Sequence, residues 1–165
     1  MQRVNVQISA RATGRLLRAF LHNRAGSPAV EFALISPLLF ALMLGIVQVG
    51  IVFNNYVELI DGVRAGSRNL AISRSAGLPW STTPYTTSTA AVTSSAMNLT
   101  AANIIITLKV NGVTCATDSA CTTALSTASG EAANVTATYP CNLTIMGVNY
   151  SPSCTLSSQS TERIE

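Results

Sequence analysis

The residue types that carry most enzyme chemistry are scarce in this sequence. The single histidine, His22, lies near the N-terminus, and the acids after residue 100 are Asp118, Glu131, Glu162 and Glu165. A Ser-His-Asp or Cys-His arrangement needs a histidine beside its nucleophile, and the four acids show no spacing typical of a general acid–base pair. No glycine-rich phosphate loop followed by a lysine occurs either. We therefore expect no catalytic residues and no cofactor, and we predict that the protein is not an enzyme.

Four cysteines all follow residue 110: Cys115, Cys121, Cys141 and Cys154. In a small exported domain, four cysteines are typical of two disulfides, for which three connectivities exist. We favour local pairing, Cys115 with Cys121 and Cys141 with Cys154. Zinc binding is the alternative, but no Cys-x-x-Cys pair occurs and the only histidine lies far away along the chain. The cysteines therefore predict an oxidised, exported domain without a metal site.

An acid stands at the start of a long apolar segment. No charged residue occurs from Phe32 to Val57, and Glu31 immediately precedes this stretch. As a helix, Phe32–Phe53 would extend about 33 Å, enough to cross a hydrocarbon core about 30 Å thick. A buried core helix is one alternative. A cleaved secretory signal is the other, but the apolar region of a signal spans only about 7–15 residues. We predict a transmembrane helix that stays with the mature protein.

The few charges, 10% of the residues, are unevenly distributed. Residues 1–26 contain five arginines and no acid, whereas residues 27–165 contain five basic and seven acidic residues. Positive charge beside a membrane helix tends to stay in the cytoplasm. We therefore expect a cytoplasmic N-terminus, with everything after about residue 54 on the far side of the membrane. The basic pI belongs to the first 26 residues and does not indicate nucleic-acid binding.

These patterns divide the chain into four segments and predict an α+β fold. Residues 1–26 form a cytoplasmic leader. Residues 27–72 form the transmembrane helix and an amphipathic stem, with a kink or a loosened turn at Pro37. Residues 73–103 are rich in Ser and Thr and are expected to be a linker, although residues 90–99 could form a short helix. Residues 104–165 form a small, disulfide-bearing, β-rich domain.

Within the β-rich domain, alternation predicts several strands. They are Ile104–Val110, Ala133–Tyr139, Asn142–Val148 and Cys154–Ser158, with a tight turn at Asn111-Gly112 after the first. On the stem, Asp61 and Arg64 have the spacing of a weak ion pair one helical turn apart.

The junction of leader and helix carries a specific pattern. A basic leader ends in Gly26, and Glu31 is the fifth residue after it, at the start of the apolar helix. Here the sequence resembles the TadE-like pseudopilins, minor pilin-like components of tight-adherence (Tad, Flp) pili and secretion systems. The resemblance runs through Gly26–Leu34, Pro37-Leu38-Leu39 and Gly45–Gly50, and it continues in the stem at Val63–Arg68. The chain end, Leu156–Glu165, looks like the closing segment of the family.

The resemblance implies a minor pilin-like subunit that takes part in assembly or initiation of a filament. A prepilin peptidase would cleave between Gly26 and Ser27. Glu31, with Phe32 beside it, would act in assembly, because its carboxylate can neutralise the new ammonium group of a neighbouring subunit. The implied partners are the peptidase, other pilins and pseudopilins, and an assembly platform in the inner membrane. The implied location is the inner membrane, with the pilin-like domain periplasmic or extracellular.

Other interpretations remain open from the sequence alone. Glu31 would also be stabilised simply as an acid near a helix N-terminus, which contributes about 0.3–1 kcal/mol. The main alternative function is a signal-anchored exported binding domain that is unrelated to filament assembly. A small anchored enzyme is the third possibility, and the missing histidine argues against it.

Overall fold

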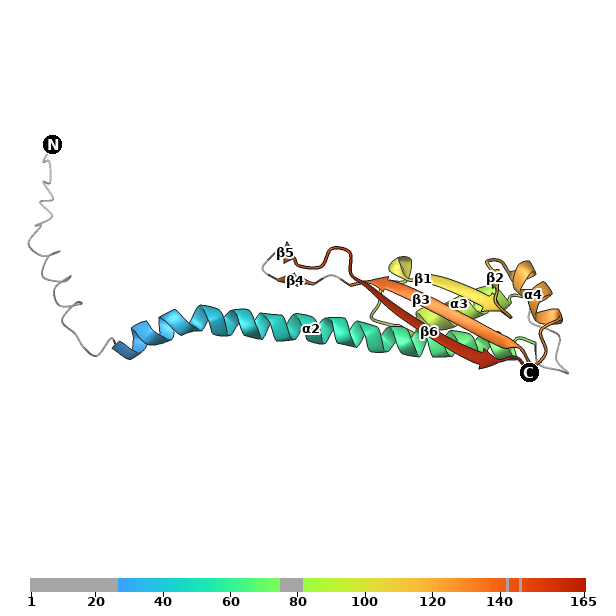
Figure 1. Ribbon diagram of the computed structural model, residues 1–165, viewed down its shortest axis with the longest axis horizontal. Coiled ribbons are helices and arrows are strands. Elements are labelled where there is room, and N and C mark those ends of the chain that lie inside the picture. The colour runs from blue at the N-terminus through green and yellow to red at the C-terminus, as the bar shows by residue number, and fades with distance from the viewer. Residues whose placement is uncertain (1–26, 75–81, 142, 146) are drawn as a thin grey trace, which may run out of the picture. The chain divides into compact units, whose positions relative to one another are not determined.

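The structure is a computed structural model that describes residues 27–74, 82–141, 143–145 and 147–165. Its helices are α2 (Ser27–Ile72), α3 (Pro84–Ser95), the 3-10 turn η2 (Ala101–Asn103) and α4 (Asp118–Ser126). Its strands are β1 (Ile105–Val110), β2 (Val113–Cys115), β3 (Ala132–Pro140), β4 (Thr144–Ile145), β5 (Val148–Asn149) and β6 (Thr155–Arg163). The chain divides into two compact units, Met1–Met43 and Leu44–Glu165, and α2 continues from the first into the second (Figure 1).

Helix α2 changes its environment along its length. The side chains of its apolar N-terminal part are exposed, among them Leu34, Ile46 and Phe53. From Leu59 onward one face is buried, and Leu59, Val63 and Leu70 have no exposed surface. The spacing of these three residues places them on one side of a helix, which is the amphipathic pattern expected of the stem. The stem is therefore an element of the folded domain and not merely a support for it.

The main sheet has four antiparallel strands in the order β2-β1-β3-β6. Strands β1 and β2 are joined by Asn111 and Gly112, whose φ angles of 48° and 78° give the left-handed turn that suits a two-residue hairpin. Strand β3 lies in the centre, paired with β1 on one side and with β6 along nine residues on the other. This confirms the predicted strands at residues 104–110 and 133–139 and the predicted Asn111-Gly112 turn.

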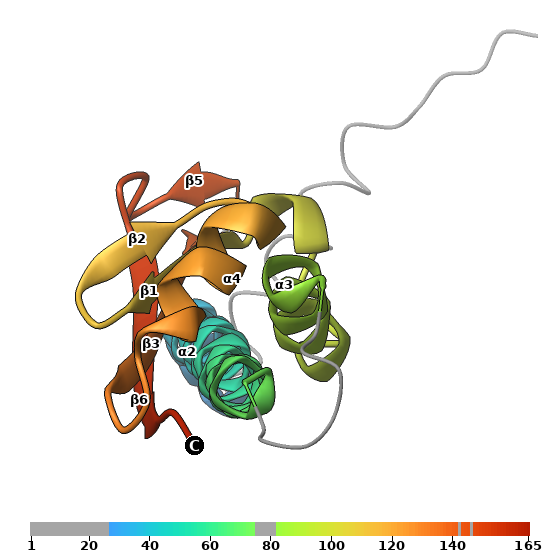
Figure 2. The same ribbon diagram turned by 90° about the vertical axis from the view of Figure 1, so that its right-hand side faces the viewer.

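The core lies on one face of this sheet. Alternate side chains of β1 and β3 are buried there, including Leu108, Val110 and Val135. Figure 2 looks along α2 and shows the three helices on the same side of the sheet, with α2 between the sheet and α3. The opposite face carries polar side chains such as Asn134, Thr136 and Thr161. One packed and one polar face is the usual arrangement of an antiparallel sheet.

Residues 73–103 were expected to be a linker, but part of this segment forms a helix that packs in the core. Residues 84–95 form helix α3, and Val92, Ala96 and Leu99 of this region are buried in the core. The helix begins with Pro84 in its first turn, a position that proline favours. The predicted short helix at 90–99 overlaps α3 but starts six residues too late. Ser and Thr dominate the exposed side of α3, so composition alone concealed a helix with a narrow apolar face.

The C-terminal part also contains elements that the strand pattern does not indicate. Strand β2 and helix α4 occupy residues left unassigned by the sequence. The expected strand at 142–148 is instead a small separate hairpin, β4–β5, of two residues per strand. The expected short strand at 154–158 is β6, which continues to Arg163 because it pairs with the whole of β3.

Candidate assembly segment and stem

The proposed processing and assembly residues fall at the beginning of α2. Ser27 is the first residue of the helix, and Glu31 and Phe32 follow within its first two turns. Both Glu31 and Phe32 are exposed in the single chain. Gly26 and the leader lie outside the described residues. The predicted processing site therefore coincides with the start of the helix, and Glu31 stands on an accessible surface of it.

Pro37 lies inside α2, and the helix continues through it. A proline lacks the N–H that would bond the carbonyl four residues earlier, which here belongs to Ala33. The hydroxyl of Ser36 donates to this carbonyl at 3.4 Å. In a membrane, where water cannot satisfy the carbonyl, such a side-chain donor helps α2 tolerate the proline.

The described residues contain one helix long and apolar enough to cross a membrane. It is Pro28–Ile72, and its most apolar window has a mean hydropathy of 2.3 and is not buried within the protein. A core helix of this length would be largely covered by other elements. The exposure of the apolar part therefore fits a membrane anchor.

Two glycines on the stem allow α3 to approach α2 closely. A β-carbon on Gly66 would lie 2.4 Å from Val92 Cγ2, and one on Gly62 would lie 2.8 Å from the carbonyl oxygen of Val92. Both distances are shorter than a van der Waals contact, so no side chain fits at either position. The spacing Gly62-x-x-x-Gly66 places both glycines on one face of α2, as in close helix pairs. The glycine in the Val63–Arg68 motif therefore has a packing role that the sequence did not disclose.

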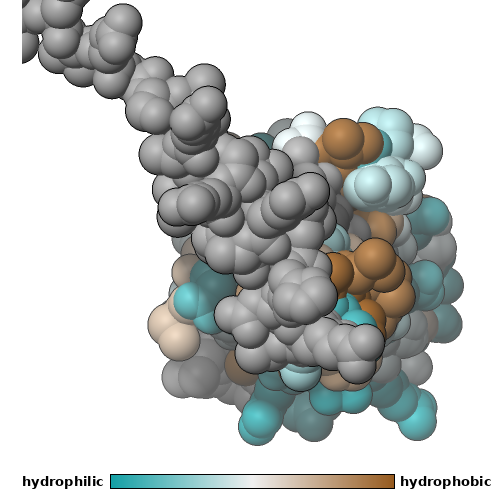
Figure 3. All heavy atoms as spheres, turned by 90° about the vertical axis from the view of Figure 1, so that its left-hand side faces the viewer, coloured by the Kyte–Doolittle hydropathy of each residue, from teal (hydrophilic) through white to brown (hydrophobic). Residues whose placement is uncertain are grey.

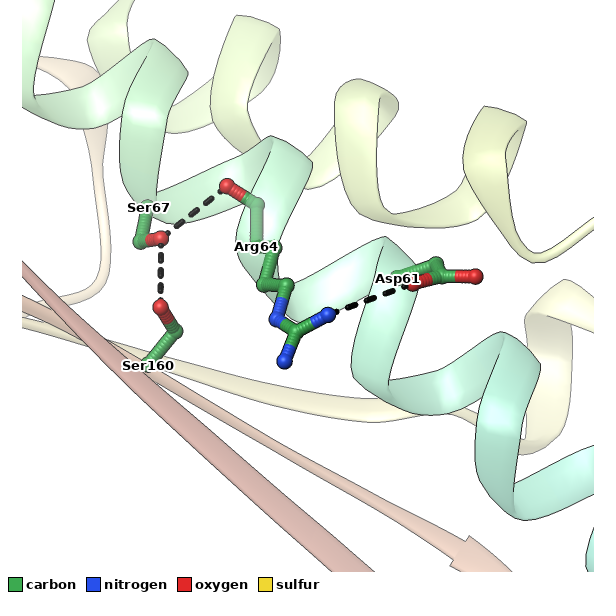
Figure 4. Close-up of polar contacts among 4 residues, drawn as sticks. All are labelled: Asp61, Arg64, Ser67 and Ser160. Carbon is green, nitrogen blue, oxygen red and sulfur yellow. Dashed lines mark hydrogen bonds and ion pairs between the residues drawn. The ribbon is translucent and has the colours of Figure 1, made fainter.

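The stem is also hydrogen-bonded to the sheet. Ser67 has no exposed surface, and its hydroxyl donates to the carbonyl of Arg64 and lies 3.0 Å from the hydroxyl of Ser160 on β6 (Figure 4). One turn earlier, Arg64 and Asp61 form the predicted ion pair, with 3.8 Å between Nη1 and Oδ1. Both of these side chains are mainly exposed, so their pair contributes little to stability.

Glu58 connects the stem to the segment that follows α3. Its carboxylate accepts hydrogen bonds from the backbone N–H of Asn98 at 3.0 Å and from the side-chain amide of the same residue. The amide of Asn54, one turn earlier on α2, donates to it as well at 3.0 Å. Glu58 therefore fixes the chain after α3 to the helix.

A second carboxylate stabilises the other end of α3. Asp118, at the start of α4, accepts from the backbone N–H of Thr86 at 2.9 Å and from the hydroxyl of Thr86 at 2.7 Å. The side-chain hydrogen bond from Thr86 lowers the pKa of Asp118 below its usual value of 3.8. The N–H groups in the first turn of a helix have no acceptor within the helix itself. Asp118, an acid from another element, accepts from one of them and so caps α3.

Both disulfides are local, as the sequence favoured. Cys115 pairs with Cys121 and Cys141 pairs with Cys154, with Cα atoms 5.0 and 5.1 Å apart. The first joins the end of β2 to α4, and Asp118 lies within its loop. The second closes the base of the β4–β5 hairpin. Sulfur here therefore holds short elements in place, and no cysteine is free.

No group of three or more His, Cys, Asp or Glu residues able to hold a metal occurs in the described part of the chain. Arg68, Glu162, Arg163 and Glu165 line one shallow polar cavity, where α2 ends beside β6. The side chains that the structure does bring together, around Gly66, Ser67 and Glu58, bind one element to another.

The fold is that of an α+β protein. One long apolar helix continues into the core of a small sheet domain that contains two disulfides. Residues 26–68 match the family model of TadE-like proteins, the family that the sequence motifs resemble. The match ends just after Gly66, which lies close to α3, and Ser67, which is hydrogen-bonded to β6. No curated protein and no solved structure matches the chain.

Proposed function

We propose that this protein is a minor pilin-like subunit of a tight-adherence (Tad, Flp) pilus or related secretion filament, acting in its assembly or initiation. The observation that carries the proposal is the TadE-like match over residues 26–68, which covers the leader junction, the apolar helix and the packed stem. An exposed apolar helix attached to a small folded domain suits a subunit that is held in a membrane before it packs against its neighbours.

In this proposal, a prepilin peptidase cleaves after Gly26, and Ser27 becomes the new N-terminus. The ammonium group then lies four residues before Glu31, on the same helix end. In the low dielectric of a helix bundle, an unpaired charge costs several kcal/mol. Pairing of Glu31 with the ammonium group of a neighbouring subunit would therefore fix the register between subunits. The partners are the peptidase, other pilins and pseudopilins, and the inner-membrane assembly platform.

The proposed location is the inner membrane, crossed once, with the N-terminus in the cytoplasm. The arginines of residues 1–26 support this orientation. The two disulfides support a domain that folds in an oxidising compartment, periplasmic or extracellular. The protein has no catalytic task in this account.

The mature N-terminus tests the proposal. Mass spectrometry of the membrane protein from a host with an active prepilin peptidase should find Ser27 first. Gly26→Val should block processing, whereas Gly45→Val, at a helix position with open space around it, should be cleaved normally. Full-length protein beginning at Met1 would contradict the proposal and favour an exported binding domain held by a simple anchor.

A further inference from the structure

The chain between β3 and β6 forms a discrete projection. Residues 141–154 are closed at their base by the Cys141–Cys154 disulfide and by a hydrogen bond from the N–H of Cys141 to the carbonyl of Cys154, 3.0 Å long. Further out, the N–H of Tyr150 donates to the carbonyl of Leu143 at 2.9 Å, and the short strands β4 and β5 pair. These contacts hold the β4–β5 hairpin as a defined element that is separate from the main sheet.

The hairpin presents apolar side chains without any charge near them in the sequence. Val148 is 55% exposed and Tyr150 is 65% exposed. No Asp, Glu, Lys or Arg occurs between Glu131 and Glu162, so the hairpin, β3 and the part of β6 up to Thr161 are uncharged. An exposed loop in water usually carries charged residues, and an uncharged tip with tyrosine is typical of the interface between water and lipid.

The contacts of β6 show where this hairpin lies along α2. Ser160 is bonded to Ser67, and three residues later Arg163 lines a cavity with Arg68 and Ile72, so β6 and α2 run in the same direction. The start of β6 lies five residues before Ser160, which is about 16 Å at a strand rise of about 3.3 Å. That distance corresponds to about eleven residues of helix, which places the start of β6 near the level of Tyr56.

The hairpin lies beyond that level. Figure 1 shows β4 and β5 extending from the sheet toward the apolar part of α2, farther than any other strand. The hairpin belongs to the same compact unit as residues 44–72 of α2. In this part of α2, the side chains of Val49, Ile51 and Phe53 precede Tyr56 and are each at least half exposed. Viewed from this end, brown apolar side chains are exposed beside both pale and teal ones (Figure 3). The hairpin and the end of the predicted transmembrane segment therefore share one level along the helix axis.

We propose that the β4–β5 hairpin is a second membrane contact, with Val148 and Tyr150 in the interfacial layer of the bilayer leaflet that faces the exported domain. This inference rests on the membrane anchoring in the proposed function. A lipid surface is the occupant because lipid surrounds α2 at the level that the hairpin reaches. Strands of two residues leave open backbone edges, which are not tolerated in hydrocarbon. The hairpin therefore rests in the headgroup region and does not enter the membrane core.

Tryptophan fluorescence in lipid vesicles tests this contact. The full-length chain has one tryptophan, Trp80, which is first replaced by phenylalanine. Val148→Trp then reports on the hairpin, and Val113→Trp is the matched control. Val113 is also an exposed strand valine, 63% accessible, and it adjoins the turn at the opposite end of β1 from the end that faces the hairpin. Phe40→Trp reports on the apolar helix. Each protein is reconstituted in phosphatidylcholine–phosphatidylglycerol vesicles with and without brominated acyl chains.

We expect brominated lipid to quench the Phe40→Trp and Val148→Trp proteins and to leave the Val113→Trp emission unchanged. Quenching of Phe40→Trp alone would overturn the hairpin contact and leave the membrane helix standing. Absence of quenching in all three would overturn both the anchoring and the hairpin contact. If Val148→Trp were protected from aqueous iodide but not quenched by brominated lipid, the hairpin would be covered by protein, which also contradicts the proposal.

Discussion

The hydroxyl groups of Ser67 and Ser160 lie 3.0 Å apart, so the stem of α2 is hydrogen-bonded to the last strand of the chain, 93 residues away. Ser67 belongs to the segment that matches the TadE-like model, whereas Ser160 lies outside it. This bond and the neighbouring close contact with α3 make the end of the anchor helix a part of the domain core.

Two buried serines, Ser67 on the stem and Ser88 on α3, should respond differently to removal of the hydroxyl. Ser67→Ala leaves Ser160 without its partner and should lower the free energy of unfolding by about 1–3 kcal/mol. Ser88 on α3 is equally buried, but its hydroxyl has no hydrogen-bond partner among the described residues. Ser88→Ala should therefore leave stability unchanged or raise it. Denaturant unfolding of the full chain in detergent measures both, and equal losses would contradict this account of the stem.

Gly66→Ala should destabilise the domain, although alanine is the better helix former. The new methyl group would meet Val92 Cγ2 at 2.4 Å, and such overpacking costs about 1–3 kcal/mol. Val92→Ala removes the opposing atom, so the double variant should lose less than the sum of the two single losses. Gly50→Ala, where nothing lies within 4 Å, is the control and should not lower stability. Additive losses in the double-mutant cycle would show that α3 does not pack on Gly66.

The native protein should contain no reactive thiol. Alkylation in denaturant without reductant should leave all four cysteines unmodified, and prior reduction should expose all four. Each disulfide is expected to contribute about 2–4 kcal/mol to stability. Peptide mapping without reductant should recover Cys115 linked to Cys121 and Cys141 linked to Cys154. Free thiols in protein isolated from the exported side, or crossed pairs, would contradict the fold described here.

The contact of Asp118 with α3 should weaken in acid. Hydrogen bonds from Thr86 lower the pKa of this carboxyl in the native state, so the unfolded chain binds its proton more readily. The stabilisation is then complete well above pH 3.8, the ordinary value, and is lost as the pH falls through 3.8 toward the lower native pKa. Asp118→Asn should lower the melting temperature at neutral pH and reduce its fall in acid. Glu131→Gln is the exposed-acid control. Parallel melting curves of the Asp118 variant and the wild type across this range would contradict the prediction.

The sequence predicted those elements whose signal lies within a single segment. The length of the apolar segment predicted the long helix. Alternating apolar residues predicted β1 and β3, which end at Asn111-Gly112 and Pro140. Asn54, Asn98 and Glu58 could not be connected from the sequence, because their contact depends on how the chain returns after α3. Glu58 is therefore unsuitable as a neutral control for Glu31, because its removal would release Asn98.

Helix α3 was concealed by composition, because seven of its twelve residues are Ser or Thr. Its buried side is defined by packing in the core, including the close approach to Gly62 and Gly66. Strand β6 shows the same limit. Its inward residues include Ser158 and Ser160, so it carries little hydrophobic alternation, and its length is set by pairing with β3. For the assembly segment, the sequence predicted the residues but not their neighbours, since the proposed partner charge belongs to another subunit.

Glu31→Gln tests whether Glu31 acts between subunits. This substitution keeps the shape and hydrogen-bonding capacity of the side chain and removes its charge. Co-purification with the other pilins should fall sharply, whereas cleavage at Ser27 and the melting temperature of the domain should stay unchanged. The matched control is Asp61→Asn, which removes an exposed acid of the same helix whose ion pair contributes little. If both variants co-purify with pilins as the wild type does, Glu31 is only a charge at a helix end, and the account of filament assembly is contradicted.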